Sequence, residues 1–217
     1  MDILEAIRTR SSARVFSQEP VEREILERVL SDASRSPSSL NIQPWEVHMV
    51  LGVERERLSR QLMRSYRERR VTCGPGTARP LPERFISRAR NCAEGMTPFV
   101  EQMGREFKSF INEGSLNFYG ASAGALIFLD DSFPPERMTD VGCFVAYLLL
   151  AAAGHGLASC PIGLLNAYDD VVKEHLNVPD SKRLVLSVAL GFADHDAAVN
   201  RFRSPRADLP EFVRWVD

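Results

Sequence analysis

Two short polar stretches near the start of the chain contain the residue types that could bind a phosphate ester. Arg10-Ser11-Ser12-Ala13-Arg14 places guanidinium groups and hydroxyls side by side. Guanidinium offers forked, charged donors, and hydroxyls satisfy the remaining phosphate acceptors. Pro37-Ser38-Ser39-Leu40-Asn41-Ile42-Gln43-Pro44-Trp45 is a loop of small donors that follows the next helical segment. Either stretch alone is typical of a helix cap or an ordinary loop, but together they predict one cofactor site built from the first third of the chain.

The motifs of several other enzyme and metal sites are missing from the sequence. No GxGxxG follows a strand and no GxxxxGKS or GxxxxGKT occurs, which argues against a Rossmann fold and a P-loop. Gly120-Ala121-Ser122-Ala123-Gly124 spells a hydrolase elbow, but it precedes a strand where an elbow follows one. We expect no metal site and assign no catalytic side chain, because neither the histidines nor the cysteines show ligand or redox-pair spacing. These residues are His48, His155, His175, His195, Cys73, Cys92, Cys143 and Cys160.

The composition indicates one folded domain rather than a nucleic-acid-binding or membrane protein. A chain of 217 residues with 44% hydrophobic residues can bury a full core. The net charge of −2 gives no reason to expect nucleic acid or an anionic membrane as partner. Asp2 and Glu5 stand where a signal peptide needs positive charge, and the longest apolar run, Cys143 to Gly154, is too short to span a bilayer. We therefore expect a reduced, cytoplasmic protein.

Periodicity predicts a mixed, helix-rich chain. Strands are expected over 45–51, 123–130 and 183–190, and a short strand or extended piece over 157–161. Helices are expected over 2–9, 21–35, 54–69, 83–111, 136–153 and 168–176. Gly95, Pro98 and Gly104 are expected to interrupt the helix over 83–111, and Thr72–Pro82 is a clear break. The helix over 136–153 is apolar on nearly every side, which predicts a central buried helix. The tail over 191–217 has little periodicity, and we expect it to lie on a partner subunit.

Several motifs along the chain resemble those of a known protein family. The two N-terminal stretches, followed later by Gly156-Leu157-Ala158-Ser159-Cys160-Pro161-Ile162-Gly163, resemble the FMN-dependent nitroreductase family. Asp140-Val141-Gly142 before an apolar helix, Leu190-Gly191-Phe192-Ala193-Asp194 and an Arg-rich end at Arg206 are similar in the same order. The resemblance covers nearly the whole chain except about residues 66–115, and within the family it points to the nitroaromatic-reducing branch.

The resemblance implies an α+β fold, in which helices flank a central mixed β-sheet. It implies an intertwined homodimer with two FMN sites at the interface and a C-terminal tail that extends across the partner. Residues 1–217 would form a single FMN-binding domain, with 66–115 as a helical lid or insertion and 191–217 as the extended tail. The methionines and phenylalanines of 66–115 suit a lid over flat substrates, although two packed helices that cap the core would use the same residues.

The same resemblance assigns the phosphate end of the flavin site. The ribityl phosphate and the pyrimidine side of the flavin would be held by Arg10, Ser11, Ser12 and Arg14. Ser11 stands where the family commonly has a second basic residue. We expect Arg203 or Arg206 to supply the missing charge from the tail.

The remaining site residues would meet the flavin ring. The loop that reaches the flavin from the partner subunit would be Pro37, Ser38, Ser39 and Asn41. The dimethylbenzene edge and N5 would lie along Pro161, Ile162, Gly163 and Leu164, with a backbone N–H directed at N5. Many relatives carry Glu-Gly where this chain has Gly163-Leu164, so side-chain help at N5 is absent. Asn117 is a further expected ring contact.

The activity implied is a ping-pong transfer of hydride from NADH or NADPH, through flavin N5, to a flat acceptor such as a nitroaromatic or a quinone. Because the flavin performs the hydride chemistry, the protein needs to bind, orient and tune it. Two alternatives use the same fold for reductive dehalogenation or enone reduction, and oxygen chemistry on the flavin is a third. A non-enzymatic flavin sensor or storage protein, or an α+β domain without a cofactor, also stays open.

Overall fold

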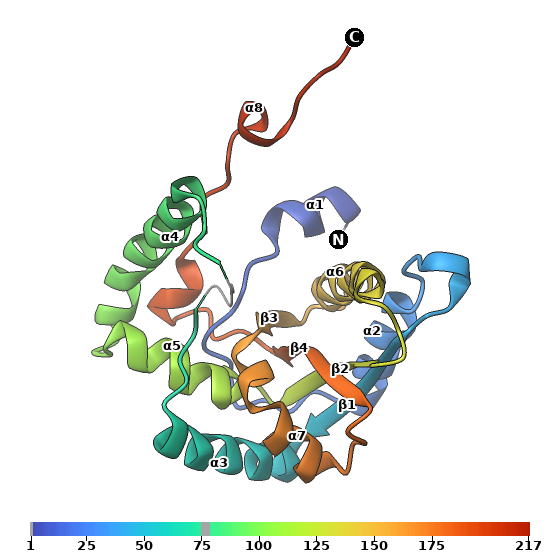
Figure 1. The fold of residues 1–217 in the computed structure, drawn as a ribbon. Helices are drawn as coiled ribbons and strands as arrows, with labels where there is room; N and C mark the ends of the chain where they lie inside the picture. The colour runs from blue at the N-terminus through green and yellow to red at the C-terminus, as the bar shows by residue number, and fades with distance from the viewer. Residues whose placement is uncertain (1, 75–78) are drawn as a thin grey trace.

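A four-stranded sheet forms the centre of the protein (Figure 1). The structure is a computed structural model that describes residues 2–74 and 79–217. The strand order is β1-β2-β4-β3, with β1 at Trp45–Leu51, β2 at Ala123–Asp130, β3 at Ala158–Ile162 and β4 at Lys182–Gly191. Each neighbouring pair of these strands is antiparallel. The expected mixed pairing is limited, in the described chain, to one parallel bridge between Ser12 and Ser159.

β2 shows why the sheet is central. All its residues from Ala123 to Leu129 are buried. Successive side chains of a strand point to opposite faces. Leu126 and Phe128 therefore enter one core, while Ala125 and Ile127 enter a second core on the other face. The expected strand over 123–130 is confirmed, and its continuous apolar run lies in a strand that is covered on both faces.

Helices cover both faces of the sheet and make three layers (Figure 1). On one face lie α2 (Arg23–Ala33) and α6 (Met138–Gly154), which pack on each other. The other face is covered by α3 (Gly52–Arg69), α5 (Phe107–Leu116) and α7 (Asp169–Leu176). Two peripheral helices are α1 (Ile3–Thr9), against α6, and α4 (Glu83–Glu101), against α5 and the tail. Short 3₁₀ turns at Leu164–Tyr168 and Ala198–Arg201 complete the framework around the site.

The segment between α3 and β2 corrects part of the sequence prediction. α4 continues through Gly95 and Pro98, and only the stretch around Gly104, whose φ is +68°, separates it from α5. Proline weakens a helix by removing one N–H. Here, however, Met96 and Val100 on the same helix are buried in a separate apolar cluster, and this packing keeps the helix continuous. The predicted break over 72–82 falls partly on residues 75–78, which lie outside the described residues.

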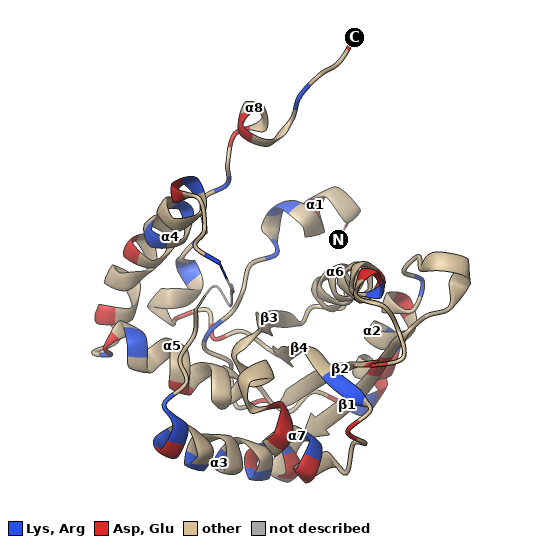
Figure 2. Cartoon of the chain, viewed as in Figure 1, with Lys and Arg blue, Asp and Glu red and all other residues tan. Residues whose placement is uncertain are grey.

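α6 is buried on one side only, which corrects the expectation of a central buried helix. Phe144 and Leu148 face the core, whereas Tyr147 is 43% exposed. Figure 2 shows that α6 carries few charges along its visible surface. Pro135–Gly154 is long and apolar enough to cross a membrane, but one such helix is weak evidence because the core helix of a soluble protein passes the same test. The exposed side of α6 therefore needs another explanation.

The chain after β4 returns to the N-terminal segment before it leaves the molecule. Ala193 forms a bridge with Phe16, and the Asp194 N–H donates to the Val15 carbonyl at 3.1 Å. The last short helix, α8 (Leu209–Phe212), then projects away from the body, and Trp215 is 84% exposed (Figure 1). The expected lack of regular structure in the tail is correct for most of its length.

Candidate functional site

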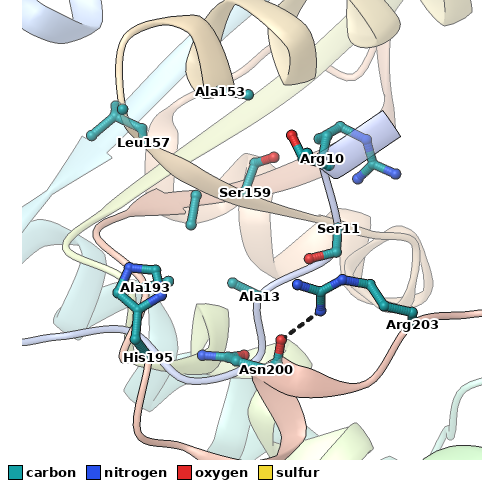
Figure 3. Close-up of a pocket in the computed structure, with 13 residues that line it drawn as sticks. Arg10, Ser11, Ala13, Ala153, Leu157, Ser159, Ala193, His195, Asn200 and Arg203 are labelled. Carbon is teal, nitrogen blue, oxygen red and sulfur yellow. Dashed lines mark hydrogen bonds between the residues drawn. The ribbon is translucent and has the colours of Figure 1, made fainter. Parts of the chain in front are cut away.

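A pocket with a basic lining lies where the end of α1, the start of β3 and the tail meet (Figure 3). We call it the Arg10 pocket, and its volume is about 260 Å³. Its walls come from three parts of the chain that are far apart in sequence. The lining residues are Thr9, Arg10, Ser11, Ala13, Ala153, Gly156, Leu157, Ala158, Ser159, Ala193, His195, Asn200 and Arg203.

Asn200 explains how the tail and the N-terminal stretch are held together. Its Oδ1 accepts from the Arg14 N–H at 2.8 Å and from the Val15 N–H at 3.3 Å. Its Nδ2 donates to the carbonyls of Val15 at 2.7 Å and Asp194 at 2.8 Å. The other edge of the stretch is fixed to β3, because the Ala13 N–H donates to the Ser159 carbonyl at 3.1 Å. One side chain therefore clamps the backbone that places Arg10 and Ser11.

The charge of the Arg10 pocket favours an anion. Arg10, Arg203 and His195 line it, and the lining residues include no Asp or Glu. Across residues 2–74 and 79–217, neither arginine has a carboxylate within 4.0 Å. The Arg203 Nη1 donates instead to the carbonyls of Asn200 at 2.7 Å, the dashed line in Figure 3, and of Phe202 at 3.0 Å. Forked donors that lack a counter-charge suit a phosphate group.

Arg14 belongs to the same N-terminal stretch as Arg10 but lines neither of the two pockets described in this subsection. Its Nη1 donates to the Ser12 carbonyl at 3.3 Å, while its Nε is buried and has no hydrogen-bond partner within the described part of the chain. An orphaned charged donor costs free energy unless a ligand or water accepts from it. Burial raises the pKa of the Cys160 thiol to about 11, and the positive charge of Arg14 opposes this rise. The positive charge of Arg14 therefore lies close enough to the buried Cys160 thiol to act on it.

A second pocket lies beyond the far end of β3. We call it the Cys73 pocket, and its volume is about 630 Å³. It has no charged side chain among its lining residues, which are Val71, Thr72, Cys73, Gly74, Gly163, Leu164, Asn166 and Ala167. Ser159, near the start of β3, lines the Arg10 pocket, and Gly163, directly after β3, lines the Cys73 pocket. Since a strand rises about 3.3 Å per residue, these two residues are roughly 13 Å apart. The site is therefore elongated, with a cationic end and an uncharged end.

The structure brings together most of the residues expected in one chain. Arg10, Ser11 and Arg203 line the cationic pocket, and Gly163 and Leu164 line the uncharged pocket. The segment that joins the two ends carries Ser12, which bridges to Ser159, together with Pro161 and Ile162 of β3. The Ile162 side chain is buried in the core, so only its backbone can face a ligand.

Other expected site residues lie elsewhere. Asn117 accepts from the Arg55 Nη1 at 2.9 Å in a separate surface hollow, and Arg206 donates to Ser204 and Pro205 beside α4. Of the two tail arginines, only Arg203 reaches the Arg10 pocket. The loop before β1 lines neither pocket of this chain and carries Pro37, Ser38, Ser39 and Asn41.

Among the lining residues of the Arg10 pocket that sequence reasoning did not assign to the site are Thr9, His195 and Asn200. Thr9 is the last residue of α1, and the other two lie in a tail without periodicity. The only available signal is that Asn favours irregular segments, where its side chain bonds to nearby backbone. That preference does not specify a partner 185 residues away, such as Val15.

Comparison with known proteins adds to this geometry. Residues 7–192 match the Nitroreductase family. Nitroreductase NfnB of Mycolicibacterium smegmatis is 34% identical over 96% of this chain and 90% of that protein. Chloronitrobenzene nitroreductase of Comamonas testosteroni is 30% identical over 97% of this chain and 95% of that protein.

Solved structures show the same fold. An FMN- and NADPH-dependent nitroreductase NfnB from Sphigopyxis sp. strain HMH superposes with a TM-score of 0.90 at 27% identity, covering 100% of both chains. The FMN-dependent NfnB from Mycobacterium smegmatis, solved in complex with NADPH, gives a TM-score of 0.89 at 31% identity over 99% of this chain and 97% of that chain.

Proposed function

The chain belongs to the nitroreductase family, and on that premise we propose that it is an FMN-dependent oxidoreductase that takes electrons from NADH or NADPH and reduces nitroaromatic compounds. One observation carries the proposal: a cationic pocket lies at one end of β3 and an uncharged pocket at the other. A cofactor with a phosphate at one end and a flat ring at the other needs these two environments. The similar proteins support it, because their names give FMN, NADPH and nitroaromatic substrates.

The residues present fit FMN. Arg10, Ser11 and Arg203 would hold the phosphate, since they supply charged and hydroxyl donors without a competing carboxylate. The buried, unpartnered Nε of Arg14 would donate to the pyrimidine side of the ring. Gly163 and Leu164, in the uncharged pocket, would lie along the opposite edge of the ring.

Bound FMN supplies hydride transfer between NAD(P)H and the acceptor. The protein supplies position and electrostatics. The positive charge of Arg14 would stabilise negative charge that develops on the pyrimidine side during reduction. The uncharged lining of the Cys73 pocket suits a flat, apolar molecule and offers no carboxylate or imidazole as a proton donor. We therefore assign no catalytic acid or base to this chain, and water would supply the protons.

We further propose that the protein acts as a homodimer. α1 exposes Ile3, Leu4 and Ile7 beside α6, which exposes Tyr147. A contiguous apolar surface of this kind is typical of a protein–protein interface. The projecting tail and the loop before β1 would then lie on the partner, where Ser38, Ser39 and Asn41 would reach its flavin.

The role of residues 66–115 also belongs to the proposal. α4 and α5 pack on each other and on the tail through Met96, Val100 and Phe110 with Val199. This cluster is separate from the two cores on the sheet. We propose that these helices form a lid over the acceptor within a single domain.

The four cysteines are free, as suits a cytoplasmic protein.

The visible spectrum of the purified protein tests the function. We expect a flavin band that bleaches when NADH or NADPH is added without oxygen, and that returns when nitrobenzene follows. A band that persists with both donors would indicate a flavin-binding protein that is not this enzyme. Absence of the band after incubation with FMN would overturn the proposal.

A further inference from the structure

The wall of the Cys73 pocket formed by residues 71–74 is held by few bonds. The Tyr168 hydroxyl donates to the Val71 carbonyl at 3.0 Å, and the Cys73 N–H donates to the Asn112 Oδ1 at 2.7 Å. Within the described residues, no other backbone hydrogen bond holds residues 72–74. We call these four residues the 71–74 segment. Its shape on the pocket side therefore depends on two side chains from other elements.

Asn112 is an unusual residue for its place. It lies on the inner face of α5 and is only 5% exposed. Its Nδ2 donates to the Lys108 carbonyl at 2.8 Å, which fixes the amide plane so that Oδ1 faces the Cys73 N–H. A buried amide is costly unless both of its ends are bonded. An apolar side chain would fill the inner face of α5 without needing hydrogen-bond partners. What Asn112 adds, compared with an apolar residue, is its hydrogen bond to the 71–74 segment.

Ser115, one turn further along α5, supports the same contact. Its Oγ lies 3.8 Å from the Cys73 Sγ and 3.1 Å from the Tyr119 hydroxyl. Ser115 is also buried, at 3% exposure. Residues three apart share a helix face. Asn112 and Ser115 are both buried polar residues of α5, and both contact Cys73. They therefore support the same segment of the Cys73 pocket.

We propose that Asn112 is a positioning residue for the reaction: it holds the 71–74 segment as one wall of the Cys73 pocket and so determines how tightly the electron acceptor binds. This inference rests on the proposed function for the identity of the ligand. It does not require Asn112 to touch the acceptor or the flavin. The phosphate contacts in the Arg10 pocket lie at the other end of β3, so loss of Asn112 leaves them in place.

The first test needs no cofactor. Selective ¹⁵N labelling of the four cysteines gives four amide signals, and the exchange of the Cys73 amide with deuterium reports on the 71–74 segment. Asn112→Leu is expected to speed this exchange about tenfold, since one hydrogen bond is lost, while the Cys160 amide in β3 serves as reference. Asn112→Asp keeps the acceptor oxygen but loses the donor to the Lys108 carbonyl, so its exchange is expected to lie between those of wild type and Asn112→Leu. Unchanged exchange in Asn112→Leu would overturn the proposal.

The second test uses the FMN-loaded protein and nitrobenzene. Asn112→Leu is expected to raise the KM for nitrobenzene about tenfold, while kcat and the Kd for FMN change less than about twofold. Asn112→Asp, which keeps the acceptor oxygen, should raise the KM less than Asn112→Leu does. Ser115→Ala should also raise it less, because a thiol–hydroxyl contact is weak. Ser109→Ala, on the exposed face of α5, is the control.

The outcomes separate the two proposals. An equal loss of kcat in the Leu and Asp variants would indicate a general structural role for Asn112 and overturn the inference. A wild-type protein that binds no flavin, or does not oxidise NAD(P)H, would overturn the proposed function instead. The exchange measurement on the protein without cofactor would still decide whether Asn112 holds the 71–74 segment.

Discussion

At the scale of single residues, the site is defined by cations that lack protein partners. Arg10 and Arg203 meet no carboxylate in the described chain, and Arg14 keeps a buried Nε without an acceptor. Most arginines of α3 behave differently, since Arg57, for example, pairs with Glu54 one turn away on the surface. The unpaired guanidinium groups of Arg10 and Arg203, which line the same pocket, are the stronger functional signal, because an anionic ligand would supply the missing partner.

Removal of the Arg10 guanidinium should weaken the binding of FMN through its phosphate. A hydrogen bond to a charged group contributes about 1.5–3 kcal/mol, so Arg10→Ala is expected to raise the Kd about 10- to 100-fold. Quenching of flavin fluorescence measures the Kd. Riboflavin, which lacks the phosphate, should bind the variant and the wild type equally. Arg8→Ala, an exposed arginine on α1, serves as the control, and an equal loss for riboflavin would contradict the assignment.

Cys160 should make stability depend on pH in alkali. Burial raises the pKa of its thiol to about 11, from an ordinary value of 9.0. The folded state therefore holds the proton more tightly than the unfolded chain does. This contribution is complete below pH 9 and is lost as the pH rises toward 11. Urea unfolding at pH 8 and pH 10.5 should show a larger loss for wild type than for Cys160→Ala, and equal losses would contradict the prediction.

At the scale of elements, the sequence predicts most strands and helices but not the contacts that build the site. β1 and β2 have the expected bounds, because alternating and continuous apolar runs are direct signals of burial. The continuation of α4 through Pro98 was not predictable, since it depends on packing around Val100. Asn112 and Asn200 gave no signal either, because a side chain bonded to distant backbone leaves no periodicity.

Part of the site was predictable because its chemistry is local. Arg10, Ser11 and Arg14 are neighbours in sequence, and so are Gly163 and Leu164. The distance between these two groups follows from the length of β3, which the sequence also indicates. Which tail arginine reaches the pocket depends on how the tail crosses the N-terminal segment, and that path is fixed by tertiary hydrogen bonds.

The clamp formed by Asn200 should be important for stability as well as for cofactor binding. Asn200→Ala removes four hydrogen bonds and leaves the N–H groups of Arg14 and Val15 without their acceptor. The free energy of unfolding is expected to fall by about 2–4 kcal/mol. Asn200→Asp keeps the acceptor oxygen and should lose less. Urea unfolding of the cofactor-free protein measures both variants, and a change in Asn200→Ala below about 0.5 kcal/mol would contradict the clamp.

Position 114, near the end of α5, should not tolerate a residue larger than glycine. A Cβ at this position would lie 2.6 Å from two ring atoms of Tyr119. Overpacking of this kind costs about 1–3 kcal/mol, so Gly114→Ala should lower the free energy of unfolding by that amount. The loss should be much smaller when Gly114→Ala is introduced into Tyr119→Leu, where the ring is absent. A double-mutant cycle by urea unfolding measures this coupling, and additive losses would contradict it.

At the scale of the whole molecule, apolar surface on α1 and α6 lies uncovered in the single chain. Tyr147→Glu places a charge on this surface and is expected to shift the protein from dimer to monomer in sedimentation experiments. Because the proposed flavin site includes the partner's loop, the monomer should also bind FMN more weakly. Arg64→Glu, on the exposed face of α3, is the control. A Tyr147→Glu dimer with normal affinity for FMN would contradict the proposed interface.

The loop before β1, with Leu40 91% exposed, lies outside both pockets of its own chain. If each flavin site combines Arg10 of one subunit with Asn41 of the other, two inactive variants can complement each other in a mixed dimer. A mixed dimer of Arg10→Ala and Asn41→Ala subunits carries one site with both defects and one site with neither. Denaturing and refolding the two variants together should therefore restore activity that neither variant has alone. Such complementation would show that each active site is formed by two subunits and that a single chain cannot form it alone.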